Sequence, residues 1–211
     1  MRIETLSPPA TDALLLGEIR THLRIDSAED DAALATLART AEAMMEAHLG
    51  LALVNRDVAL YLDRFPTCEQ NNTCWWQGMR EGPMSWLSGV GRALELPLRP
   101  LIAISKVEVW QGDGWQEWTA ANYSVSAGLL PLLHLAGGNV WPMPSRPADG
   151  IRITARTGFG EDWNAVPATI RHAMLQLVAW LYTHKGDEPG ENAVTASGAA
   201  SMVNAYRRAR L

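Results

Sequence analysis

The chain has 211 residues, of which 47% are hydrophobic and 19% are charged, and its formal net charge at pH 7 is −5. A chain of this length buries about 70% of its unfolded surface, so it needs no disulfide or metal to fold. The acidic balance excludes a protein whose whole surface binds nucleic acid.

The first third of the sequence predicts two helices. A cap at Thr11 or Asp12 begins a helix that runs to Leu23, because apolar residues recur there at helical spacing. Ser27 begins an S-x-x-D capping motif, which predicts the start of a second, longer helix. Gly50 is expected to end this second helix in the left-handed conformation.

Residues 54–160 have the pattern of a β-rich lobe. Runs such as RDVALYLDRF and GIRITARTG alternate between apolar and polar residues, which is typical of strands with one wet face. Gly112, Asp113 and Gly114 predict a hairpin turn. Residues 66–92 have no clean period and are rich in Gly, Asn and Trp, which predicts a long surface loop.

Two features of this loop concern its partners and its redox state. Trp75, Trp76 and Trp86 are candidate contacts with a partner protein, because an exposed tryptophan pair is typical of interaction surfaces. Cys68 and Cys74 are too few for a zinc quartet or a disulfide framework. We interpret them as reduced loop cysteines.

The last third predicts a central helix followed by a tail. Pro167 begins a helix that is apolar almost all round and ends near Lys185. Residues 186–197 are rich in Gly, Ala, Ser and Glu, which predicts a flexible leash. Residues 200–210 are too short for a stable lone helix, so we expect them to fold on a partner. The candidate partner-binding residues of this tail are Met202, Val203, Tyr206, Arg207, Arg208, Arg210 and Leu211.

Together these elements predict an α+β protein with a small bundle of three main helices, an inserted β-rich lobe and a flexible C-terminal tail. The expected parts are 1–53 and 161–185 for the bundle, 54–160 for the lobe, and 186–211 for the linker and docking tail. The N-terminus lacks the apolar core of a signal peptide, and the run AMLQLVAWLY is too short to span a bilayer. We therefore expect a protein made in the cytoplasm, with no membrane contact.

The sequence predicts no catalytic residue, no metal site and no cofactor. The five histidines are scattered without metal-ligand spacing, and GFGEDW lacks the third glycine of a dinucleotide-binding turn. The alternative is a carbohydrate-active or other hydrolytic virion enzyme, whose Trp-rich lobe would surround paired acids such as Glu108 and Glu117. We favour tryptophans that fill a β core and an interface.

The second predicted helix is strongly acidic. Its carboxylates are Glu29, Asp30, Asp31, Glu42 and Glu46, against a single Arg39. Repulsion by phosphates therefore disfavours a helix-turn-helix regulator that reads DNA with this helix.

Several stretches, in order, resemble the head–tail connector (adaptor) proteins of long-tailed bacteriophages and of related gene transfer agents. They are HLRIDSAEDD, LPLRPLIAISKVEVW, the WP at Trp141, the GFG after IRITART, VPATIRHAMLQLVAWLY and the closing YRRARL. The resemblance covers nearly the whole chain. The chain departs from the family pattern at 66–92, which is longer and richer in tryptophan.

The resemblance implies a structural part of a virion neck. Such adaptors form a ring, twelve-fold in the particle, beneath the portal protein, and they join the head to a stopper or other tail-side protein. DNA passes through the ring without sequence-specific binding. The resemblance also implies that the C-terminal segment docks on the portal or on a neighbouring copy. An acidic lining lets phosphates slide, so the face with Glu29, Asp30, Asp31, Glu42 and Glu46 is a candidate channel wall or subunit seam.

Overall fold

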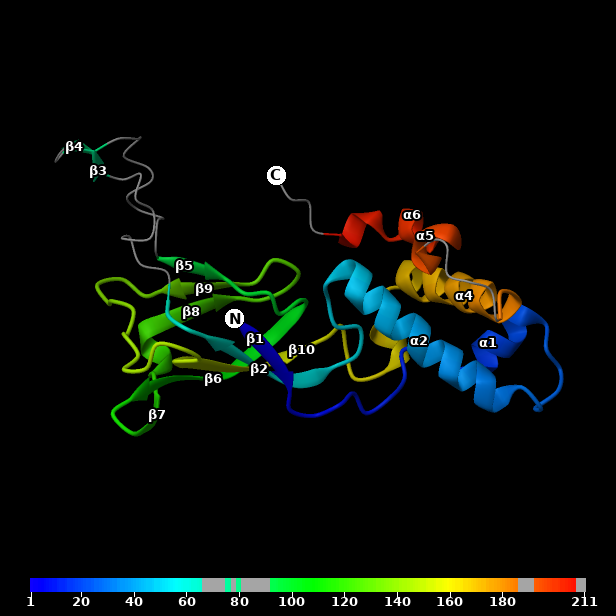
Figure 1. Cartoon of the computed structure of the whole chain (residues 1–211), viewed down its shortest axis with the longest axis horizontal. Helices are drawn as coiled ribbons and strands as arrows, with labels where there is room; N and C mark the ends of the chain where they lie inside the picture. The colour runs from blue at the N-terminus through cyan, green and yellow to red at the C-terminus, as the bar shows by residue number, and fades with distance from the viewer. Residues whose placement is uncertain (66–74, 77–78, 81–91, 186–191, 208–211) are drawn as a thin grey trace. The chain divides into compact units, whose positions relative to one another are not determined.

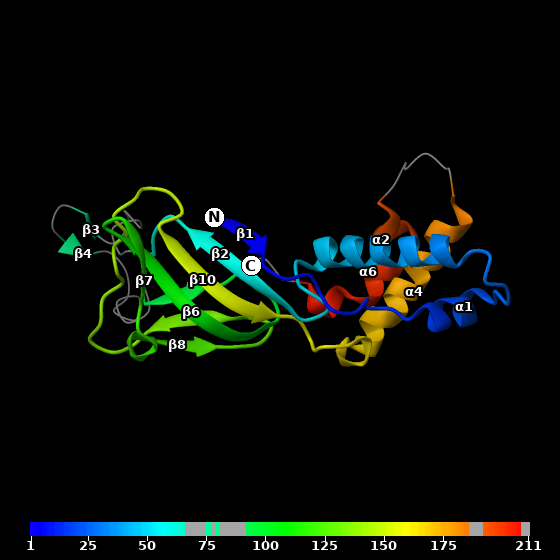
Figure 2. The same ribbon diagram turned by 90° about the horizontal axis from the view of Figure 1, so that it is seen from below.

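The computed structural model describes residues 1–65, 75–76, 79–80, 92–185 and 192–207. The chain divides into two compact units, and each unit is assembled from separated segments (Figures 1 and 2). The β unit consists of Met1–Ser7 and Asp57–Thr157, and the helical unit of Pro8–Arg56 and Gly158–Leu211. The fold is therefore α+β with three main helices, as the sequence predicts.

The β unit is built on a five-stranded sheet with the strand order β1-β2-β10-β6-β7. Its strands are β1 (Arg2–Thr5), β2 (Arg56–Leu62), β10 (Ile151–Thr157), β6 (Leu101–Gln111) and β7 (Gly114–Glu117). The pairs β1–β2, β10–β6 and β6–β7 are antiparallel. The predicted hairpin is the β6–β7 turn, where Gly112 has a φ of 60°. A glycine fits there because it has no Cβ to clash in this conformation.

A three-stranded sheet with the order β5-β9-β8 completes the β unit. Its strands are β5 (Ala93–Glu95), β9 (Leu132–Leu135) and β8 (Tyr123–Ser126). Leu133 of this sheet lies in one apolar core with alternate residues of the five-stranded sheet, such as Leu60, Val107 and Ile153. The two sheets therefore share a core, as in a β-sandwich.

The edge strand β1 is a feature that the sequence analysis missed. All four of its residues are exposed, so no apolar alternation marks it. Its register pairs Ile3 with Leu60 and Thr5 with Val58. The strand thus forms because β2 offers a free edge, which is a tertiary signal that local propensity does not carry.

Most of the predicted 66–92 loop lies outside the described residues, including Trp86, Cys68 and Cys74. Two short strands are described within it, β3 (Trp75–Trp76) and β4 (Met79–Arg80), and they pair antiparallel. The prediction that Trp75, Trp76 and Trp86 contact a partner therefore stays a prediction.

The helical unit contains α1 (Leu16–Leu23), α2 (Asp31–Leu49) and α4 (Ala168–Thr183). Helix α2 packs on α4, and α1 packs on both. Buried residues of α2 and α4 form the core; examples are Leu34, Met45, Ile170, Met174 and Leu177. In the parts of the chain that the structure describes, no helix combines the length and the apolar character needed to cross a membrane.

The start of α2 differs from the prediction. The helix begins at Asp31 rather than after Ser27, and Asp30 occupies the capping position without a side-chain capping bond. The Asp30 carboxylate instead accepts a hydrogen bond from the hydroxyl of Tyr182 on α4, at 2.6 Å. A tertiary contact has therefore replaced the local cap that the sequence pattern favours. At the other end, Gly50 ends the helix with a φ of 64°, as predicted.

Candidate functional site: the C-terminal segment and the acidic helix

The C-terminal segment folds onto the helical unit. It forms two short helices, α5 (Ala193–Ala196) and α6 (Ala199–Met202), and a 3-10 turn at Asn204–Tyr206. The Asn192 side chain accepts a hydrogen bond from the Val194 N–H at 3.0 Å and so caps α5. Both short helices pack on α4. The segment is thus part of the helical core.

This packing differs from the predicted leash, which ran to Ser197. Ala193, Val194, Ala199 and Val203 are all buried, at 0–8% exposed. Small side chains let the backbone approach α4 closely, whereas composition alone reads the same Ala, Gly and Ser residues as disorder. The useful signal was the asparagine cap followed by apolar residues.

The candidate tail residues have different surroundings. Val203 is fully buried, so in this conformation it stabilises the unit and is not available to a partner. Met202 is half-buried, and the half-buried Tyr206 ring packs edge-to-face on Phe159 with a centroid distance of 6.4 Å. Arg207 is exposed. The remaining candidates, Arg208, Arg210 and Leu211, lie outside the described residues.

The first turn of the acidic helix is bound to its neighbours. Asp31 accepts hydrogen bonds from the Arg20 guanidinium of α1, at 2.7 Å from Nε and from Nη2 as well. Asp30 is held by Tyr182, as described above. Glu29 is exposed. Of these three carboxylates, Glu29 is the one that the structure presents to solvent without such a contact.

The last two turns of α2 contain a part-buried charge cluster. Glu46 receives a fork of hydrogen bonds from Arg56, at 3.0 and 2.5 Å, and a third from the Leu53 N–H at 2.8 Å. Glu42 accepts from the Ala13 N–H at 3.2 Å. Burial raises the pKa of Glu42, and the nearby Glu46 raises it further, whereas the Ala13 N–H acts in the opposite direction.

Glu42 and Glu46, which were predicted to belong to a channel or subunit-seam face, are therefore largely covered by contacts within the helical unit. Their side chains are 12% and 18% exposed. They close the helical unit by bonding Arg56 and two backbone N–H groups. Reversing their charge would break these bonds, so such a change would not report on a channel.

The tryptophans in the described part of 92–157 have two kinds of surroundings. Trp118 and Trp141 pack on Phe65, with ring centroids 5.6 and 4.5 Å away, and lie half-buried against the core of the β unit. Trp110 and Trp115 lie edge-to-face at 5.3 Å, outside the buried core cluster. The positions of Trp118 and Trp141 agree with the expected β-core role, and the expected interface role of the tryptophans stays a prediction.

The two acids named for the enzyme alternative lie on neighbouring strands of the five-stranded sheet. Glu108 and Glu117 are opposite each other in the β6–β7 register. Glu108 is buried and accepts two hydrogen bonds from Arg152, at 2.7 and 2.9 Å, and one from Lys106 at 3.0 Å. The hydrogen bonds from Arg152 lower the pKa of Glu108. A general acid needs the opposite shift. The Glu108 carboxylate is instead the anion of two ion pairs, with Arg152 and Lys106.

Comparisons with known proteins find likeness in structure. No protein-family model matches the chain, and no curated protein matches it. A chain in a structure described as the virion of a native gene transfer agent particle matches with a TM-score of 0.75 and 22% sequence identity. Two structures of the particle neck, empty with C6 symmetry and native with C12 symmetry, each contain a chain that matches with a TM-score of 0.72 and 22% identity. Each match covers 100% of this chain and 97% of the other. The fold is shared over the whole length.

Proposed function

We propose that this protein is a structural component of the neck of a gene transfer agent or a related tailed phage. The observation that carries the proposal is the fold match, which spans all of this chain and nearly all of a chain in two neck structures. In this role the protein is a head–tail connector. Copies of it form a ring beneath the portal, twelve-fold as in the C12 neck structure, and join the head to a tail-side protein.

Ion pairs that join different elements support a structural role for this protein. The pairs Arg20–Asp31, Arg56–Glu46 and Arg152–Glu108 each join different elements of one unit. Bidentate arginine–carboxylate pairs fix geometry as well as contributing energy. A subunit of a ring through which DNA passes needs such rigidity. It needs no surface that recognises base sequence.

We expect the end of the C-terminal segment to contact the portal. Because Val203 is buried and Tyr206 packs on Phe159, the part of the segment beyond them is the best candidate for docking. It holds Arg207 and Arg208, which belong to a residue type that anchors interfaces.

Co-purification with the portal protein of the same particle tests this proposal. The full chain should bind portal rings, and averaged electron micrographs should show an added ring beneath each portal. The variant Arg207→Gln/Arg208→Gln should bind about tenfold more weakly, since it loses two anchors. The matched control Arg24→Gln/Arg39→Gln removes the same charge from two exposed arginines elsewhere in the helical unit and should bind normally.

The outcomes distinguish the connector role from docking through Arg207 and Arg208. Failure of the unaltered chain to bind the portal would contradict the connector role itself. Normal binding by Arg207→Gln/Arg208→Gln would leave the connector role intact and would reject docking through these arginines. Truncation at Lys185 is a poor test, because it also removes Val194, Ala199 and Val203 from the core.

A further inference from the structure

An exposed apolar knob lies at one end of the β unit. It consists of Ile102 at the start of β6 and Leu129 and Leu130 in the β8–β9 loop. A two-way bridge between Leu101 and Gly128, with both N–H···O distances at 2.9 Å, holds the loop beside the strand. Leu130 is 64% exposed.

The backbone of the knob is held in place. The buried Arg99 donates from Nε to the Leu129 carbonyl at 2.6 Å. The Leu96 N–H donates to the Pro131 carbonyl at 3.0 Å. An apolar group held in this way loses little conformational entropy when it binds, so it is suited to act as an anchor.

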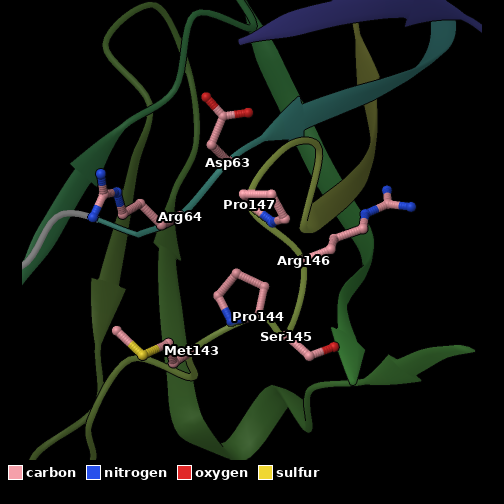
Figure 3. Close-up of a pocket in the computed structure, with 7 residues that line it drawn as sticks. All are labelled: Asp63, Arg64, Met143, Pro144, Ser145, Arg146 and Pro147. Carbon is pink, nitrogen blue, oxygen red and sulfur yellow. The ribbon is translucent and has the colours of Figure 1, made fainter. Parts of the chain in front are cut away.

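A pocket of about 350 Å³ lies at the other end of β6. Its lining residues are Asp63, Arg64, Met143, Pro144, Ser145, Arg146 and Pro147. Figure 3 shows the two proline rings in the middle of this group, with Arg64 and Arg146 on opposite sides. The pocket lining therefore combines apolar side chains with charged ones.

The pocket walls are also fixed. Ser145 donates its N–H to the Trp110 carbonyl at 2.8 Å, and the Arg146 guanidinium lies over the Trp110 ring at 4.5 Å. Trp110 and Ile102 stand eight positions apart on β6, which is roughly 26 Å at about 3.3 Å per residue. The knob and the pocket therefore occupy opposite ends of one strand.

We propose that the knob of one copy enters the pocket of the next copy. This inference rests on the proposed function and names the contact between neighbouring subunits of the ring. Two different surfaces at opposite ends of a unit allow a contact that passes from one copy to the next. They make a head-to-tail contact, which repeats from copy to copy and closes into a ring when the rotation allows. The C6 and C12 neck structures support repetition of this kind.

The charges around the two surfaces are complementary. Glu95 is exposed and pairs in register with Leu132, two positions from Leu130, so a carboxylate lies beside the knob. The pocket lining carries Arg64, Arg146 and Asp63, so its net charge is positive. Opposite charges at a rim set the register of an interface and speed encounter.

Cysteine cross-linking tests the contact in assembled rings. In a Cys68→Ser/Cys74→Ser background, Leu130→Cys and Met143→Cys are combined in the full chain, and rings bound to the portal are treated with a short bismaleimide. The double-cysteine protein should give a ladder of covalent dimers, trimers and larger species. Either single-cysteine variant should give monomers, because a head-to-tail contact joins two different positions.

Substitutions give a second readout. Leu130→Asp should lower the fraction of protein in rings by about tenfold or more, as expected for an interface anchor. Leu15→Asp is the matched control, because Leu15 is an exposed leucine of the helical unit. Glu95→Arg should weaken ring formation, and adding Arg64→Glu should restore it.

The cross-linking results test the knob-and-pocket contact separately from the connector role. Rings that form normally on the portal but give no ladder would overturn the knob-and-pocket contact and leave the connector role standing. A double-cysteine protein that stops at dimers would show a reciprocal two-fold contact and would overturn the head-to-tail arrangement as well. A chain that forms neither rings nor a portal complex overturns both proposals.

Discussion

At the scale of single residues, two glutamates with opposite pKa shifts show how each unit uses its charges. Burial raises the pKa of Glu42 above its ordinary value of 4.5, so the folded chain binds this proton more tightly than the unfolded chain does. The hydrogen bonds from Arg152 lower the pKa of Glu108, so the folded chain holds that carboxylate ionised. The two groups must therefore contribute to stability with opposite dependence on pH.

Glu42→Gln should be better tolerated at pH 7 than at pH 4. Ionised Glu42 costs stability once the pH rises above 4.5, and this cost grows until the folded-state pKa is passed. Glutamine keeps an oxygen for the Ala13 N–H and carries no charge. Urea unfolding at both pH values measures the effect, with the exposed Glu29→Gln as control. If Glu42→Gln destabilises the protein more at pH 7 than at pH 4, the pKa of Glu42 is not raised in the folded chain.

Glu108→Gln should show the reverse dependence. The stability from this carboxylate is present above pH 4.5 and is lost as the pH falls through its lowered folded-state pKa. At pH 7 the variant should lose about 1–3 kcal/mol of unfolding free energy, the typical cost of leaving a charged hydrogen-bonding partner unsatisfied. At pH 3 the loss should be smaller. An equal loss at both values in urea titrations would show that the ion pair with Arg152 is not its source.

At the scale of elements, the sequence predicted the helices and strands whose own residues show a clear apolar period or turn motif. The alternation in β2 and β10, the β6–β7 turn and the apolar stripe of α4 all identified elements that the structure contains. Elements that depend on distant partners were missed or displaced. Strand β1 has no buried side chain, and the start of α2 is set by Tyr182, which lies far along the chain. The surroundings of the candidate site residues could not be predicted, because burial of Val203 and of the Glu42–Glu46 pair depends on packing.

Val203→Ala tests whether the C-terminal segment belongs to the fold. Val203 is fully buried, so removing two methyl groups should cost about 2 kcal/mol of unfolding free energy. The exposed Val140→Ala is the matched control and should change stability little. Denaturant unfolding of the isolated protein gives the answer. If Val203→Ala proves as neutral as the control, the segment does not pack on α4 in solution.

At the scale of the whole molecule, the chain carries two separate apolar cores. Buried residues of the helical unit form one cluster, and buried residues of the β unit form another. Ile153→Ala and Met174→Ala each open a cavity in a different core. Their costs should therefore add to within about 0.5 kcal/mol in the double variant, as for distant sites without shared partners.

Hydrogen exchange complements that measurement. Ile153→Ala should raise exchange chiefly in the β unit, and Met174→Ala chiefly in the helical unit, since each cavity lies within one cluster. A strong departure from additivity, with protection lost in both units from either substitution, would show that the cores fold as one.

The discontinuous make-up of both units also bears on synthesis by the ribosome. Strand β1 leaves the exit tunnel long before β2, and α2 ends at Leu49 whereas its partner α4 begins at Ala168. Neither unit is complete when its first segment emerges. The nascent chain must therefore keep the apolar side of α2 from aggregating while the entire β unit is translated, which makes holding by a chaperone at that stage a natural requirement of this fold.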